Sequence, residues 1–119
     1  MAYLCTTQAE IDQKVGAGVG AGWTTAMAEA AEIRHLATMS CISRYNWVDN
    51  MPTNEDVKGI LSDIVASLIA AEGISYDMSG YTSRIEAEDM VTIQRDIALR
   101  GLSLIRDQKV VTFIIANAT

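Results

Sequence analysis

The most regular pattern of apolar positions lies in the middle of the chain, over residues 54–72. Pro52 precedes this stretch, and Glu55 and Asp56 give it an acidic first turn that suits the positive end of a helix dipole. Gly73 follows, typical of a left-handed cap that ends a helix. We therefore predict a long central helix over residues 54–72. Its apolar residues recur every three or four positions, as on one face of a helix: Val57, Ile60, Leu61, Ile64, Val65, Leu68 and Ile69.

A shorter helix is predicted near the start of the chain. Thr7 and Glu10 have the spacing of a capping box, so a helix is expected over about residues 8–15. The alternating glycines of residues 16–22 then predict a loop. Phosphate binding by this loop is disfavoured, because it lacks the Lys of a Walker motif and follows a helix instead of a strand.

A second long helix is expected over residues 25–45. One of its faces carries mostly small side chains, which would let the central helix approach closely. Apolar residues also occur on its other faces, which is typical of a helix that is deeply buried or that contacts another subunit. The face of small side chains comprises Ala26, Ala30, Ile33, Ala37 and Cys41.

A third long helix is expected over residues 84–108, starting from a capping box formed by Ser83 and Glu86. We interpret Glu86, Glu88 and Asp89 as partners of the helix dipole, in preference to an acid–base pair or metal ligands. With Gly101 as a point of close approach, the apolar face of this helix comprises Met90, Ile93, Ile97, Leu104 and Ile105.

The last apolar segment, residues 110–115, has the composition of a β-strand. It is β-branched and aromatic throughout, and a strand left alone cannot satisfy its backbone hydrogen bonds. We expect it to pair with residues 2–5 or to add to a partner subunit. The predicted partner-binding residues of this strand are Val110, Val111, Thr112, Phe113, Ile114 and Ile115.

Together these elements predict a single, mainly α domain over residues 1–119. We expect a small bundle of three to four helices, with a C-terminal strand that pairs with a terminal strand or a partner subunit. Half of the residues are hydrophobic, 20% are charged and only one is Pro, which disfavours disorder. The helices carry more apolar residues than one small bundle can bury, so contacts with other subunits are expected.

The aromatic residues outside the helices divide into two groups. Trp47 lies in a polar corner before Pro52 and is expected to pack between two helices, with its indole nitrogen bound to an acceptor. Tyr76, Met78 and Tyr81 lie in a predicted exposed loop, whose composition is typical of an adaptable contact surface. A loop folded over the bundle is the equal alternative.

The sequence offers little chemistry. Cys5 and Cys41 have no partner motif, so we expect buried free thiols in a reducing cytosol. His35 is the only histidine and no ligand cluster surrounds it, so we expect no metal site and no role for it. With no nucleophile beside a base and no cofactor loop, the chain is not expected to be an enzyme or to hold a cofactor.

The net charge of −6 disfavours a surface that grips duplex DNA, although an acidic wall could surround DNA without binding it. No apolar run approaches the roughly 20 residues that span a bilayer, so no membrane contact is expected. The first five residues lack a basic flank and a long apolar run, so we do not interpret them as a signal peptide.

Three segments resemble head–tail connector (adaptor) proteins of tailed bacteriophages. They are the turn at residues 45–49 (Tyr-Asn-Trp-Val-Asp), the loop at residues 76–81 (Tyr-Asp-Met-Ser-Gly-Tyr) and the run at residues 84–90 (Arg-Ile-Glu-Ala-Glu-Asp-Met). Together with the helical layout, the resemblance extends over residues 6–115. These proteins share a helical layout far more than they share invariant motifs.

The resemblance implies a structural virion protein without catalytic residues. Such a protein forms a ring of identical subunits, usually a dodecamer, beneath the portal. The ring links the capsid to the tail or neck proteins and continues the DNA channel, through which DNA passes without sequence-specific binding. The protein would be made in the cytoplasm of the bacterial host and then reside at the head–tail interface. The alternative is a small helical protein-binding or regulatory module of a phage or bacterium.

Overall fold

A computed structural model of the chain describes residues 3–16, 22–76 and 83–119. These residues form helices and connecting turns, and no strand occurs among them. The mainly α prediction therefore agrees with the structure, whereas the predicted three to four helices with a C-terminal strand are wrong. The helices are α1 (Gln8–Val15), α2 (Thr25–Ser43), α3 (Glu55–Tyr76), α4 (Arg84–Ile105) and α5 (Gln108–Ala116).

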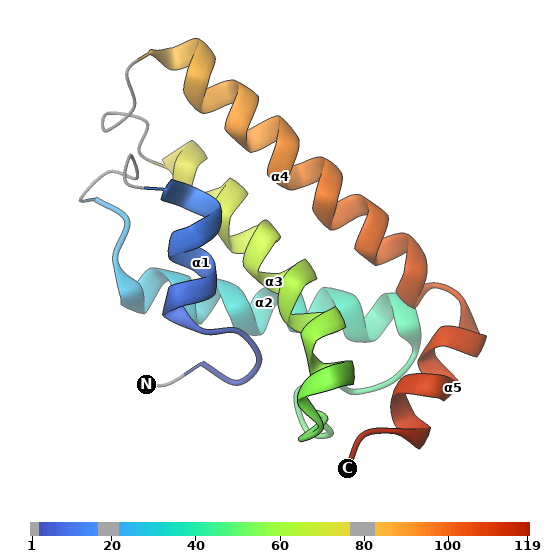
Figure 1. The fold of residues 1–119 in the computed structure, drawn as a ribbon. Helices are drawn as coiled ribbons and strands as arrows, with labels where there is room; N and C mark the ends of the chain where they lie inside the picture. Colours follow the sequence, from blue (N-terminus) through green and yellow to red (C-terminus); the bar gives the residue numbers. More distant parts are fainter. Residues whose placement is uncertain (1–2, 17–21, 77–82) are drawn as a thin grey trace.

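The helices are arranged around α3. Helix α4 runs antiparallel to α3, and the contact between these two helices is the most extensive in the bundle. Helices α1 and α2 pack on α3 from other directions (Figure 1). Helix α5 turns back at the end of α4 and lies beside the start of α3. The residues that follow α5 hold the chain just before α3, because the Ala118 carbonyl accepts hydrogen bonds from the backbone N–H groups of Thr53 and Asn54 at 2.9 and 3.1 Å.

The predicted helix starts are largely confirmed. Helix α1 has the expected bounds, and the Thr7 hydroxyl accepts a hydrogen bond from the backbone N–H of Glu10 at 3.2 Å. At the start of α4, the Ser83 hydroxyl likewise accepts from the N–H of Glu86 at 3.1 Å. Helix α2 ends two residues earlier than expected, where Arg44 adopts a left-handed conformation with φ of 59°.

The prediction that Gly73 ends the central helix is wrong. Helix α3 continues to Tyr76, and Gly73 is a buried residue within it. A Cβ at Gly73 would lie 2.8 Å from Nε1 of Trp23. The glycine therefore makes room for the Trp23 ring, and the following apolar residue, Ile74, is buried in the core instead of forming a cap.

The C-terminal segment is a helix and not a strand. Helix α4 ends at Ile105, short of the predicted residue 108, and the Asp107 side chain caps α5 by accepting from the N–H of Lys109 at 2.9 Å. A helix satisfies its own backbone hydrogen bonds and needs no partner strand, which resolves the difficulty of a lone strand. Burial of Val111 and Ile114, three residues apart on one helical face, outweighs the β propensity of the segment.

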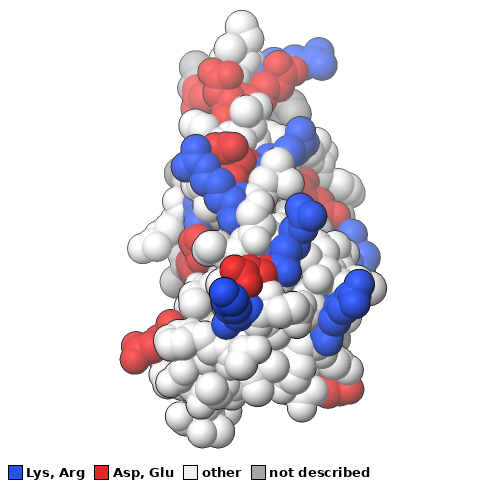
Figure 2. All heavy atoms as spheres, turned by 90° about the vertical axis from the view of Figure 1, so that its right-hand side faces the viewer, with Lys and Arg blue, Asp and Glu red and all other residues white. Residues whose placement is uncertain are grey.

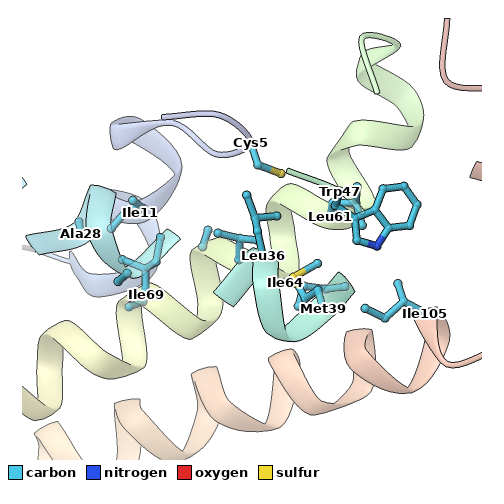
Figure 3. Packing of buried hydrophobic residues seen from close by; sticks show 14 of the residues in the cluster. Cys5, Ile11, Ala28, Leu36, Met39, Trp47, Leu61, Ile64, Ile69 and Ile105 are labelled. Atoms are coloured by element: carbon cyan, nitrogen blue, oxygen red, sulfur yellow. The ribbon is translucent and has the colours of Figure 1, made fainter. Parts of the chain in front are cut away.

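Trp47 packs between helices with its indole nitrogen bound to an acceptor, as predicted. It is fully buried among side chains of α2, α3 and α4 (Figure 3). Its indole Nε1 donates a hydrogen bond to the Ser43 hydroxyl at 2.7 Å, and the ring of Tyr45 meets it edge-on with centroids 4.7 Å apart. The polar corner thus folds back to close one end of the bundle.

A buried carboxylate holds the N-terminal segment in place. Glu32 of α2 is only 1% exposed, and its two oxygens accept hydrogen bonds from the backbone N–H groups of Leu4, Cys5 and Thr6 at 2.7, 3.0 and 2.9 Å. Three donors on one carboxylate compensate for the desolvation of its charge. This link fixes the segment that leads into α1.

Candidate interaction surface

Helix α5 divides the predicted partner-binding residues between the core and the solvent. Val111 and Ile114 are buried against the bundle, and Val110 is partly buried. Thr112 and Ile115 are exposed, and Phe113 is 58% exposed. A helix period places Phe113 away from the buried face, so Phe113 is the large apolar side chain of α5 that remains most accessible to a partner.

The second predicted contact surface is described only at Tyr76. This residue is the last of α3, is 59% exposed, and stacks in a tilted arrangement against Trp23 with centroids 5.7 Å apart. Met78 and Tyr81 lie outside the described residues, as do residues 17–21 of the glycine-rich segment. Tyr76 ends α3, whereas the residues after α5 bond to the chain just before α3, so the structure does not bring Tyr76 together with α5.

Helix α4 carries apolar side chains on its solvent side. Ile93 and Leu104 belong to the predicted apolar face of this helix, and they are 56% and 53% exposed. Leu99 and Ile85, at 55% and 71%, are also exposed, but the helical period places them on a different side of α4 from Ile93 and Leu104. Helix α4 therefore fully buries only a narrow stripe, which includes Ala87, Val91, Ala98 and Ile105. Met90, Ile97 and Leu102 are partly buried beside it.

An open groove of about 510 Å³ runs between α3 and α4. Gly101 lets the two helices approach closely along it, as the sequence predicted, because a Cβ there would overlap the side chain of Ile64. The lining is mostly apolar, with two carboxylates on the α3 side and one guanidinium on the α4 side. It comprises Asp56, Gly59, Ile60, Asp63, Ile64, Ile97, Arg100, Gly101 and Leu104. Ile60, Ile64, Ile97 and Leu104 belong to the predicted apolar faces of the two helices, and no local sequence signal distinguishes a groove from a filled interface.

Helix α1 docks on α3 beside the groove. Its Ile11 and Val15 are 2% exposed, and Lys14 forms an ion pair with Asp63 at 2.8 Å. The backbone carbonyl of Lys14 also accepts a hydrogen bond from the Gln94 side chain of α4 at 3.3 Å. Helix α1 thus spans from α3 to α4 next to the open groove.

Positive and negative side chains are mixed on the side of the molecule that carries α4 and α5 (Figure 2). Figure 2 shows Lys and Arg interleaved with Asp and Glu over the upper part, and few charges at the lower end, where Figure 1 places α5. Several charges are paired within α4, where Arg84 contacts Glu88 at 2.9 Å and Arg100 contacts Asp96 at 3.0 Å. Glu88, one of the acidic residues near the start of α4, therefore forms an ion pair with a residue one turn earlier in the same helix.

The titratable groups form no reactive centre within the described part of the chain. Cys5 is buried, and burial together with the nearby Glu32 carboxylate raises the pKa of its thiol to about 12. Cys41 is exposed, so the expectation that both thiols are buried is wrong for it. Among the described residues, no group of three or more His, Cys, Asp or Glu side chains could hold a metal ion.

His35 has a structural partner that the sequence did not reveal. Its Nε2 lies 3.1 Å from a carboxylate oxygen of Glu72 in α3, and Arg34 contacts the other oxygen at 2.9 Å. Burial lowers the pKa of His35, although the Glu72 carboxylate acts in the opposite direction. The three side chains connect α2 to the last part of α3.

None of the described helices is long and apolar enough to cross a membrane. Comparison of the chain with family models, with curated proteins and with solved structures finds no match.

Proposed function

We propose that the chain is a head–tail connector subunit of a tailed bacteriophage, one of a ring of identical copies beneath the portal. The resemblance of residues 45–49, 76–81 and 84–90 to adaptor proteins motivates this assignment. The ring would contact the portal on one side and a tail or neck protein on the other. It would reside in the virion and extend the DNA channel.

The observation that carries the proposal is the apolar surface of α4 and α5. Ile93, Leu99, Leu104 and Phe113 are each more than half exposed on a chain of 119 residues. Several large apolar side chains left exposed on a small chain are typical of surfaces that become buried in an assembly. In a ring, each copy can cover such a surface on its neighbour.

The function of such a subunit is mechanical. Subunit contacts bury the apolar faces, and the excess of acidic residues keeps the channel from trapping DNA by like-charge repulsion. Docking through an added C-terminal strand is not part of this mechanism, because residues 108–116 form α5. The contacts are therefore made by preformed helices, chiefly α4 and α5.

Light scattering of the purified chain, alone and mixed with the portal ring of the same phage, tests the proposal. A connector adds the mass of a ring of copies to the portal, whether or not it assembles alone. The Leu99→Ser variant, which alters an exposed side chain, is expected to keep its helical content and to bind less well. No mass increase with the portal would reject the connector and favour the alternative, a helical protein-binding or regulatory module.

A further inference from the structure

The groove between α3 and α4 is filled only in part by the chain itself. Helix α1 docks beside it with two buried apolar residues, Ile11 and Val15, and with Lys14 paired to Asp63. Helix α1 is thus a short helix whose cation pairs with a carboxylate of α3 and whose apolar side chains are buried in the core. The open part of the groove extends from there along α3 toward Asp56.

Asp56 repeats the position of Asp63 along the groove. The two residues are seven positions apart, about two helical turns, so they lie on the same side of α3. Lys14 pairs with Asp63, whereas no ion pair to Asp56 occurs among the described residues. Arg100, the cation on the opposite side of the groove, is directed to Asp96. The open part of the groove therefore offers an acidic group and an apolar floor.

The outer face of α5 is complementary to this part of the groove. Lys109, Thr112, Phe113 and Ala116 are all exposed and follow the spacing of one helical face. Lys109 forms no ion pair within the described residues, and Phe113 is 58% exposed. Helix α5 thus presents one cation and one large apolar side chain, whereas α1 docks with one cation and two apolar side chains.

The spacing along the two helices also matches. Asp56 and Ile60 are four residues apart, and so are Lys109 and Phe113, a rise of about 6 Å in both helices. A parallel arrangement that places Phe113 beside Ile60 brings Lys109 to Asp56. The groove segment of α3, residues 56–64, is as long as the nine residues of α5. In this register the small side chain of Ala116 falls at the level of Asp63, one residue before Ile64, near the point where Gly101 brings the two helices close together.

We infer that the groove between α3 and α4 binds the outer face of α5 from a second copy of this chain. Within one chain, α5 turns Val111 and Ile114 inward, so its outer face is free to enter the groove of another copy. The two surfaces are different, and such a contact can close into a ring when it repeats. This inference rests on the proposed function, since it names the contact that joins the copies of the connector.

Two half-blocked variants test the contact. In Asp56→Lys the groove is blocked and α5 is intact, while in Lys109→Asp/Phe113→Ser the α5 face is blocked and the groove is intact. Each is expected to be monomeric in sedimentation velocity at up to about 1 mM, and an equimolar mixture of the two is expected to form a one-to-one complex. The wild type is expected to self-associate over the same range.

Charge exchange provides the second arm. Asp56→Lys and Lys109→Asp are each expected to weaken self-association of the wild type about tenfold or more, and the double variant is expected to recover most of the loss. Glu55→Lys is the matched control, because it reverses a charge in the same first turn of α3 but does not line the groove. It is expected to leave self-association unchanged.

The inference is overturned if the wild type stays monomeric at about 1 mM, if the half-blocked variants do not combine, or if the double charge exchange fails to restore association. These results would leave the connector assignment standing when the portal still binds a ring of copies. Conversely, self-association through this groove without any mass added to the portal would reject the connector while keeping the contact.

Discussion

Gly101 of α4 lies directly against Ile64 of α3. A Cβ built at Gly101 would overlap Cγ1 of Ile64 and would lie 3.0 Å from its Cδ1. The two helices are therefore as close at this point as their side chains allow. The same contact forms the floor of the groove between them, so the shape of the groove depends on this glycine.

Gly101→Ala is expected to destabilise the fold by about 1–3 kcal/mol, although Ala is the better helix former. The added methyl group forces Ile64 or the backbone of α4 to move. Combining it with Ile64→Ala should give a double variant that is less destabilised than the sum of the two single changes. Urea unfolding curves measure all three.

Gly59→Ala is the control for this experiment. Gly59 lies on the same groove, but a Cβ there would meet nothing within 4 Å. The substitution is expected to stabilise α3 by about 0.5–1 kcal/mol through helix propensity. Equal destabilisation by both substitutions would contradict the close approach at Gly101.

Glu32→Ala is expected to destabilise the fold by roughly 3 kcal/mol or more, because it leaves the N–H groups of Leu4, Cys5 and Thr6 without an acceptor, and those of Cys5 and Thr6 are buried. Release of this segment should also expose the Cys5 thiol. In the wild type, a thiol reagent is expected to modify Cys41 quickly and Cys5 only slowly, whereas both should react quickly in the variant. Glu55→Ala, at an exposed position, should change neither stability nor thiol reactivity.

His35 predicts a specific pH dependence of stability. Burial lowers the pKa of His35 in the folded protein below its value of 6.5 in a free chain. The unfolded chain then binds the proton more tightly, so the free energy of unfolding falls as the pH drops below about 6.5, until His35 is protonated in the folded state as well. The difference in urea midpoint between wild type and His35→Gln should shrink or reverse over this range. A difference that stays constant with pH would contradict the assignment.

The helical form of residues 108–116 makes a prediction that a strand would not. Ile114 and Val111 face the core together, so Ile114→Ala and Val111→Ala are both expected to be destabilising, the first by about 2–4 kcal/mol. Phe113→Ala should change stability by less than about 0.5 kcal/mol, because the side chain is exposed. In a strand, Val111 and Phe113 would share a face, and their substitutions would have similar effects.

The strong local signals predicted the helices well. Capping at Thr7 and Ser83 gave the starts of α1 and α4, and the apolar period predicted α3. The packing of Trp47 between helices was predictable, because burial of its large ring is favourable and its indole N–H can be satisfied by a nearby acceptor. These features depend on residues near one another in sequence.

The errors concern features that depend on distant residues. Gly73 has the sequence form of a helix cap, but Trp23, fifty positions earlier, decides that it serves as a packing site. The β-branched C-terminal segment became a helix because the bundle offers an apolar surface to Val111 and Ile114. The groove and the exposure of Leu104 likewise follow from the position of α1 and α4 on α3, which no local pattern encodes.

The central claim is that neighbouring subunits bury the exposed apolar side chains of α4 and α5. Electron cryomicroscopy of the neck of the phage particle tests this claim most directly. The account predicts a ring of copies of this chain beneath the portal, with Leu104 and Phe113 buried between subunits. A neck that lacks the chain, or a ring in which both side chains face the solvent, would contradict it.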